Sequence, residues 1–125
     1  MHALVDCFAA ITGQPVLHSR SPGLCADALA RAGLDGVYTR LAAGSAREAL
    51  SLARQLGMTG LQLTAPFKLE ALGLVDDLSP RARQAGCLNT VVLWERTAGL
   101  NTDVAGVLAT LREADIRAGR AVILG

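Results

Sequence analysis

The sequence predicts an α/β fold in which a mostly parallel, twisted sheet carries helices on both faces. Short apolar segments alternate with segments of helical periodicity, and the connections between them are short. Aromatic residues make up only 3% of the chain, so the core has to consist mainly of Ala, Leu and Val, which suits helices packed closely on a sheet. At 125 residues the chain has the length of one ordinary domain.

The first strand and the first helix are separated by a loop that contains a proline. Cys7–Thr12 is a short apolar run that ends at Gly13, which predicts a buried strand. Ser21 and Pro22 predict the start of a helix, with Ser21 as the capping residue and Pro22 in the first helical position. The helix is expected to end at Gly33, a natural residue for that position.

A second strand and a second helix follow. Val37–Leu41 alternates as a short strand does, and Ser45 is suited to cap the next helix, which ends at Gly57. One face of this helix is expected to be apolar and to consist of Ala49, Leu50, Ala53 and Leu56.

The middle of the chain predicts shorter elements. Gly60–Thr64 is apolar enough for a third strand, and Lys68–Val75 favours a short helix. Ser79 and Pro80 predict another helical turn, in the same way as Ser21 and Pro22.

The last part of the chain predicts a hairpin or a tight crossover, followed by a helix and a strand. Leu88–Glu95 is rich in β-forming residues, and Arg96–Gly99 is expected to be a turn. Asp103 is suited to cap a helix that ends near Ala114. Arg120–Gly125 predicts a final strand that ends at a glycine. In the helix that begins at Asp103, the residues expected to face the core are Val107, Leu108 and Leu111.

Composition argues against several classes of protein. The 12 basic and 11 acidic residues give a formal net charge of +1. No run of basic residues is suited to bind a phosphate backbone, so nucleic acid is not an expected partner. No export signal and no apolar run of about 18 residues is recognised, so no membrane span is expected. Cys7, Cys25 and Cys87 lack disulfide or zinc spacing and are expected to be buried free thiols in a protein of the reducing cytoplasm, without a metal.

Four polar clusters lie at predicted strand ends or helix starts, where open α/β sheets bind ligands. They are His18–Ser21, Thr64 with Lys68, Asn89 with Thr90, and Asn101–Asp103. Each cluster taken alone also has a structural explanation as a helix cap or as a turn that bonds its own backbone. Both explanations stay open at this point.

Four segments, in this order along the chain, resemble motifs of the shikimate dehydrogenase family. GQPVLHSRSP at 13–22 resembles G-x-P-x-x-H-S-x-S-P, and GLQLTAPFK at 60–68 resembles G-x-N-V-T-x-P-x-K. AGCLNTVV at 85–92 resembles G-A-x-N-T, and GLNTDVAG at 99–106 resembles G-x-N-T-D-x-x-G. The chain is therefore similar to the N-terminal, substrate-binding domain of that family, from Phe8 onward.

This resemblance implies the roles of individual residues. Ser19 and Ser21 would donate to the carboxylate of shikimate. Lys68 and Asp103 would form the catalytic pair: the lysine supplies charge and a proton as the carbonyl of 3-dehydroshikimate takes up hydride, and the aspartate holds the lysine and binds a hydroxyl. The substrate-binding residues are expected to be Ser19, Ser21, Gln62, Thr64, Lys68, Asn89 and Asp103.

The resemblance also implies a division into domains. Residues 1–118 would form the substrate-binding domain, and residues 119–125 the first strand of a nicotinamide-binding domain, with Gly125 as its first cofactor-binding residue. The cofactor would be NADP or NAD, a choice that the sequence leaves open. The chain alone is expected to be inactive, because it has no hydride donor.

Other functions stay open. Gln62 stands where the family usually has Asn, so quinate or an amino analogue of shikimate is an alternative substrate. An alternative from a different class is a non-catalytic domain that binds shikimate as a sensor. Association into a homodimer is also left open.

Overall fold

The computed structural model describes residues 5–117 and 119–124. Within them the sheet has six strands in the order β2-β1-β3-β5-β6-β4. Only β5 runs against the other strands, because its pairings with β3 and β6 are antiparallel and the remaining pairings are parallel. The prediction of a mostly parallel sheet is confirmed. The elements are β1 (Cys7–Gly13), α1 (Ser21–Ala32), β2 (Gly36–Ala42), α2 (Ala46–Gln55), β3 (Gly60–Leu63), α3 (Phe67–Glu70), η1 (Ala71–Gly73), β4 (Asp77–Leu78), α4 (Pro80–Ala85), β5 (Thr90–Leu93), β6 (Thr97–Leu100) and α5 (Asp103–Glu113).

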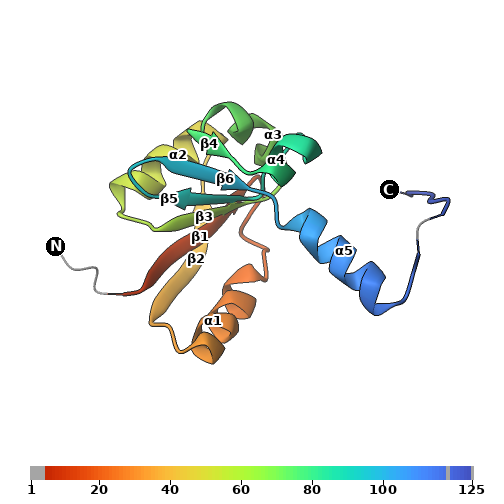
Figure 1. The fold of residues 1–125 in the computed structure, drawn as a ribbon. Coiled ribbons are helices and arrows are strands. Elements are labelled where there is room, and N and C mark those ends of the chain that lie inside the picture. The colour runs from red at the N-terminus through yellow and green to blue at the C-terminus, as the bar shows by residue number, and fades with distance from the viewer. Residues whose placement is uncertain (1–4, 118, 125) are drawn as a thin grey trace.

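Helices cover both faces of the sheet, as predicted. From β1 the chain crosses through α1 to β2 on one side, and it then returns through α2 to β3 on the other side of β1. Two right-handed crossovers in opposite directions place their helices on opposite faces. Figure 1 shows α1 below the sheet and α2, α3 and α4 above it.

The core lies between the sheet and α2. Leu61 and Leu63, on alternate positions of β3, are each 1% exposed, and they pack with Ala49, Leu50 and Ala53 of α2. The predicted apolar face of this helix is therefore confirmed for those three residues. Leu56, the fourth member of the predicted face, lies just past the helix and is exposed.

The last helix does not pack as predicted. The three residues expected to face the core are instead exposed, and α5 has no buried residue. Figure 1 shows the reason: α5 leaves the end of β6 and extends away from the sheet, so its apolar side meets no other helix of the described residues. The residues are Val107, Leu108 and Leu111.

Two predicted helix caps are wrong and two are confirmed, one of which is Ser79, whose hydroxyl accepts a hydrogen bond from the backbone of Ala82 at 3.1 Å. Ser45 caps α2 by accepting a hydrogen bond from the backbone of Glu48 at 3.1 Å. Ser21 is instead the first residue of α1, and its own N–H donates to the hydroxyl of Ser19 at 3.2 Å. Asp103 is likewise the first residue of its helix, and no side chain at the preceding position supplies a cap.

The hairpin is confirmed, but its turn is shorter than predicted. Residues 97–99 were expected to belong to the turn. They are instead part of strand β6, Thr97–Leu100, which pairs with β5. The strand is held by a residue that is distant in sequence. Asp76 accepts hydrogen bonds from the backbone of Thr97 at 2.6 Å and from its hydroxyl at 2.8 Å. These bonds lower the pKa of Asp76. Asp77–Leu78, next to this contact, forms the short strand β4, which was not predicted.

Residues 120–124 have neither helix nor strand geometry, so the final strand predicted there is absent from the described residues. Val122, Ile123 and Leu124 are almost fully exposed, and the predicted cofactor residue Gly125 lies outside the described residues. The cysteines are free thiols, as predicted, but they are half-buried rather than buried. No helix in the described part of the chain has the length and apolar character needed to cross a membrane.

Candidate active site

The polar clusters meet at one edge of the sheet. The loop with Ser19 follows the carboxyl end of β1, Thr64 follows β3, and Asp103 comes shortly after β6. Asn89 directly precedes β5, and because β5 runs in the opposite direction, its amino end lies at this same edge. This is the edge at which open α/β sheets bind ligands.

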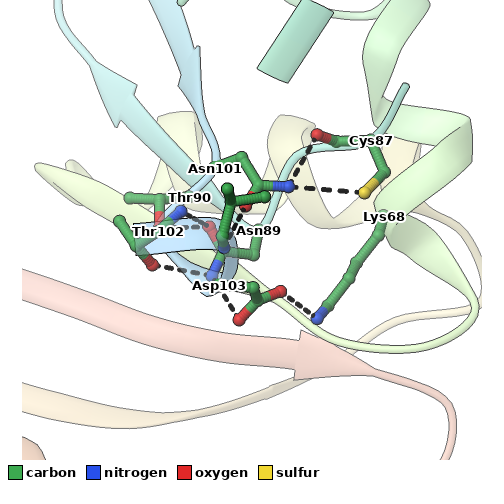
Figure 2. Close-up of polar contacts among 8 residues, drawn as sticks. Lys68, Cys87, Asn89, Thr90, Asn101, Thr102 and Asp103 are labelled. Atoms are coloured by element: carbon green, nitrogen blue, oxygen red, sulfur yellow. Dashed lines mark hydrogen bonds and ion pairs between the residues drawn. The ribbon is translucent and has the colours of Figure 1, made fainter. Parts of the chain in front are cut away.

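Lys68 and Asp103 form an ion pair. The Nζ of Lys68, from α3, lies 2.6 Å from the Oδ2 of Asp103, in the first turn of α5 (Figure 2). Their side chains are 32% and 51% exposed, so a ligand can reach both groups. The predicted catalytic pair is thus brought together by two elements that are 35 positions apart in sequence.

Lys68 is also the only lysine of the chain, and the rest of its 12 Lys and Arg residues are arginines. A guanidinium keeps its proton under all ordinary conditions, whereas an ammonium can give one up when its surroundings favour it. The single lysine lies at the ligand-binding edge, beside a carboxylate. Its position therefore suits a proton donor, in addition to a fixed positive charge.

Asn89 holds this pair in place. It is 2% exposed, and its Nδ2 donates to the Oδ1 of Asp103 at 3.0 Å and to the hydroxyl of Thr102 at 2.8 Å. Its Oδ1 accepts from the backbone of Thr102 at 3.0 Å and from the hydroxyl of Thr90 at 3.1 Å (Figure 2). An amide has two donor hydrogens and two acceptor positions, and all four are used. In this arrangement Asn89 orients Asp103, and its predicted contact with the ligand would require it to exchange one of these hydrogen bonds.

Asn101 fixes the start of α5 and was not among the predicted site residues. Its Oδ1 accepts from the backbone of Val104 at 3.1 Å, which takes over the capping role predicted for Asp103. Its Nδ2 donates to the carbonyl of Cys87 at 3.1 Å. Because Asn101 supplies the cap, the carboxylate of Asp103 is left to bind Lys68 and Asn89. The repeated Asn-Thr in 89–90 and 101–102 was the sequence signal for this network.

Two hydroxyls form the second part of the site. The hydroxyl of Ser19 donates to the hydroxyl of Ser21 at 3.2 Å. The two residues predicted to bind the carboxylate of the substrate therefore lie side by side. Arg40, near the carboxyl end of β2, donates to the carbonyl of Ser19 from Nε at 3.0 Å and from Nη2 at 2.6 Å. The sequence did not indicate Arg40, because its partner lies 21 positions away.

Gln62 lies on β3 and Thr64 directly follows this strand. Both lie between the ion pair and the two serine hydroxyls. Gln62 accepts a hydrogen bond from the hydroxyl of Tyr38, another residue that the sequence analysis missed. The backbone of Thr64 donates to the carbonyl of Thr12 at 2.9 Å, which ties the end of β3 to β1. Gly13 permits this approach, since a Cβ there would lie 2.9 Å from the carbonyl oxygen of Ala65 and would overlap the methyl group of Thr64.

A hollow of about 410 Å³ lies next to Asn101 and Thr102. Its walls are mostly apolar, and neither Lys68 nor Asp103 lines it. The site is therefore assigned from the convergence of polar groups at the sheet edge. The hollow is lined by Ser79, Pro80, Arg81, Leu100, Asn101, Thr102 and Ala105.

The starts of α2 and α5 are not free to hold the phosphates of a dinucleotide. A pyrophosphate is held by a glycine-rich turn and free backbone N–H groups at a helix start. At the start of α2, the N–H groups of Ala46 and Arg47 already donate to the carboxylate of Glu70, at 3.0 and 3.4 Å. At the start of α5, the carboxylate of Asp103 would repel a phosphate. Among residues 5–117 and 119–124, no three His, Cys, Asp or Glu side chains gather as metal ligands.

The sequence matches a known protein family. Residues 11–91 match the family described as "Shikimate dehydrogenase substrate binding domain". A shikimate dehydrogenase (NADP(+)) of Rhodospirillum rubrum is 44% identical over 125 residues, which is 94% of this chain and 44% of that protein. One of Anaeromyxobacter is 39% identical over 117 residues, covering 91% of this chain and 42% of that protein.

Solved structures resemble the fold closely. Shikimate 5-dehydrogenase from Thermus thermophilus, in complex with shikimate, has a TM-score of 0.82 and 36% identity, over 91% of this chain and 45% of that one. Quinate dehydrogenase from Corynebacterium glutamicum, in complex with NAD, has a TM-score of 0.81 and 32% identity, over 90% of this chain and 43% of that one. The chain thus spans less than half the length of these proteins.

Proposed function

The chain belongs to the family of shikimate dehydrogenase substrate-binding domains, and we propose that it binds shikimate and 3-dehydroshikimate at the edge described above. The whole enzyme would interconvert these two compounds with NADP, the cofactor in the names of its relatives, or with NAD. The observation that carries the proposal is the ion pair of Lys68 and Asp103, 2.6 Å apart and fixed by a buried asparagine.

The ligand carboxylate is assigned to the hydroxyls of Ser19 and Ser21. Two adjacent hydroxyls can each donate one hydrogen bond to a carboxylate once they no longer bond each other. Arg40 already donates to the carbonyl of Ser19, which places its positive charge at this loop. Its guanidinium therefore favours an anion at this place. The remaining ligand contacts are assigned to Gln62 and Thr64, with Lys68 and Asp103 at the reacting oxygen.

Lys68 is assigned as the proton donor. When the carbonyl of 3-dehydroshikimate becomes a hydroxyl, negative charge grows on its oxygen and one proton has to arrive. The Nζ of Lys68 supplies both the positive charge and the proton. Asp103 keeps the ammonium in place and accepts a hydrogen bond from a ligand hydroxyl. In the overall reaction a nicotinamide provides the hydride, and the described residues account only for substrate binding and for the proton.

The division into domains follows from this assignment. Residues 1–118 are assigned to substrate binding, and residues 119–125 to the start of a cofactor-binding domain. Because the chain spans 44% of its Rhodospirillum relative, turnover is a property proposed for the whole enzyme. The protein is assigned to the cytoplasm, in keeping with its three free thiols.

Quinate is the second candidate ligand. It is supported by the likeness to the quinate dehydrogenase and by Gln62, which stands where the family usually has a shorter Asn. A non-catalytic sensor is supported less well, because a sensor has no need of a lysine beside a carboxylate at the reacting oxygen.

NMR titration of the ¹⁵N-labelled chain tests the proposed function. We expect shikimate to shift the backbone amides of Ser19, Ser21, Lys68 and Asp103. The methyl ester of shikimate, which lacks the charged carboxylate, is the matched ligand, and it is expected to leave the two serine amides almost unchanged. Equal shifts with both ligands, or shifts confined to other parts of the chain, would contradict the assignment.

A further inference from the structure

Gln62 faces the side of the sheet that carries α1. Its neighbours Leu61 and Leu63 are each 1% exposed and belong to the core under α2. Because successive side chains of a strand point to opposite faces, Gln62 has to point to the other side. Its side chain is therefore kept apart from the main core.

Gln62 is part of a row that joins the two halves of the site. In the sheet register it lies between Ile11 of β1 and Thr90 of β5, and Ile11 is in turn paired with Arg40 of β2. Arg40, at one end of the row, holds the carbonyl of Ser19. Thr90, at the other end, donates to Asn89, which holds Asp103. The amide of Gln62 thus lies between the hydroxyls and the ion pair.

Tyr38 fixes one end of this amide. Tyr38 is on β2, two positions before Arg40 on the same face, and its hydroxyl donates to the Oε1 of Gln62. Burial, and to a smaller extent the thiol of Cys25, raise the pKa of Tyr38, so the phenol stays protonated at neutral pH. Because Oε1 is the group bonded to Tyr38, both N–H groups of Nε2 are directed away from the phenol.

We propose that Tyr38 is a positioning residue that orients the Gln62 amide so that its Nε2 donates to a hydroxyl oxygen of a cyclic polyhydroxy carboxylate bound between the serines and Lys68. This proposal rests on the proposed function. The additional methylene of Gln62, compared with Asn, adds a rotatable bond, and the bond from Tyr38 removes that freedom before the ligand arrives. Such preorganisation raises affinity, because less rotamer entropy is lost on binding.

A double-mutant cycle tests the proposal. Tyr38→Phe removes one hydroxyl, and Gln62→Met keeps nearly the same shape without polar atoms. Binding of shikimate to the chain is measured by calorimetry for the parent, both single variants and the double variant. We expect Tyr38→Phe to weaken binding about three- to tenfold when Gln62 is present and by less than about twofold in the Gln62→Met background. Thermal unfolding of each variant checks that it is folded.

Two outcomes would overturn the proposal. If Tyr38→Phe has no effect, or weakens binding equally in both backgrounds, Tyr38 does not act through Gln62. If the parent chain itself does not bind shikimate, the proposed function fails, and this proposal fails with it. The side-chain amide resonances of Gln62 in the ligand-free chain separate these cases, since a fixed amide shifts on Tyr38→Phe whether or not a ligand binds.

Discussion

At the scale of single residues, Lys68 and Asp103 have to be distinguished from an ordinary surface ion pair. An exposed pair contributes little to stability, typically less than about 1 kcal/mol. The fold does not need such a pair, so its effect should appear in chemistry. Arg31 and Asp27, 3.3 Å apart on α1, form an ion pair that has no place in the site and serves as a control.

The first prediction concerns the proton of Lys68. In the whole enzyme we expect Lys68→Arg, which keeps the charge but gives up no proton, to lower kcat about 100-fold or more while shikimate binding changes little. Steady-state kinetics and calorimetry measure the two effects. Arg31→Lys is the matched control and should leave both unchanged. A kcat for Lys68→Arg within a few-fold of the parent would contradict the role of proton donor.

The second prediction concerns Asn89. Asn89→Ala removes the hydrogen-bond partner of the Thr102 backbone N–H and of the Oδ1 of Asp103, whose Oδ2 keeps its contact with Lys68, so we expect a loss of about 1–3 kcal/mol in the free energy of unfolding. Shikimate binding should weaken as well, because Asp103 is no longer oriented. Urea denaturation and calorimetry measure both quantities.

Thr90→Val is the control for Asn89, because it removes only one hydrogen bond to the same amide. We expect it to have a smaller effect on both measurements. If Asn89→Ala weakened the fold but left binding intact, the orienting role of Asn89 would be wrong.

How far single residues could be predicted depended on where their partners lie. The hydroxyls of Ser19 and Ser21 are neighbours in sequence, and the resemblance of a short segment was enough to indicate them. Arg40 and Tyr38 act on residues 21 and 24 positions away, across two strands. A local pattern contains no information on such contacts, so both were missed.

At the scale of elements, the approach of β1 to β3 sets the shape of the site. Gly13 allows it, since any Cβ there would meet the methyl group of Thr64 and the carbonyl of Ala65. We expect Gly13→Ala to lower the free energy of unfolding by about 1–3 kcal/mol, because backbone atoms have to move. Chemical denaturation measures this change.

Gly23→Ala is the matched control for this prediction. Gly23 lies inside α1 with nothing within 4 Å of a new Cβ, so the substitution should be neutral or stabilise the chain by up to about 1 kcal/mol. Equal effects of the two substitutions would show that the contact with Thr64 and Ala65 does not constrain β1.

Elements were predictable where local signals and burial agree. The cap at Ser45 and the apolar face of α2 are both local features, and α2 packs on the core as its pattern requires. α5 also has apolar residues at helical spacing but leaves the sheet, and none of its residues is buried. Thr97–Leu100 contains a glycine, which is typical of a turn, and it is a strand because Asp76 and β5 bind it.

At the scale of the whole molecule, the stability of the fold should depend on pH through the carboxyl group of Asp76. Hydrogen bonds from Thr97 lower the pKa of Asp76 in the folded chain below its usual value of 3.8. A carboxyl group whose folded pKa is lowered stabilises the fold above its unfolded pKa, and this contribution is lost as pH falls through the folded value. We therefore expect the melting temperature to decrease below about pH 4.

The variant Asp76→Asn tests this acid dependence. It should lower the melting temperature at neutral pH and make the decrease below about pH 4 shallower. Asp27→Asn, at an exposed position of α1, is the control and should leave the pH profile nearly unchanged. A profile that Asp76→Asn leaves as steep as that of the parent would contradict the role of the contact with Thr97.

The whole molecule also explains why distant motifs form one site. The parallel strands and the single reversed strand bring the carboxyl ends of β1, β3 and β6 and the amino end of β5 to one edge. The order of the motifs along the chain predicted their family. Only the topology shows that the serine pair and the ion pair belong to the same edge, joined through the row that contains Gln62.

The central claim is that shikimate binds at Lys68 and Asp103, and calorimetric titration of the chain tests it most directly. The parent chain is compared with the Lys68→Ala, Asp103→Ala double variant, and thermal unfolding of both proteins checks that each is folded. We predict saturable binding of shikimate by the parent and loss of that binding in the double variant. The absence of binding by the parent at millimolar shikimate, or equal binding by both proteins, would contradict the account.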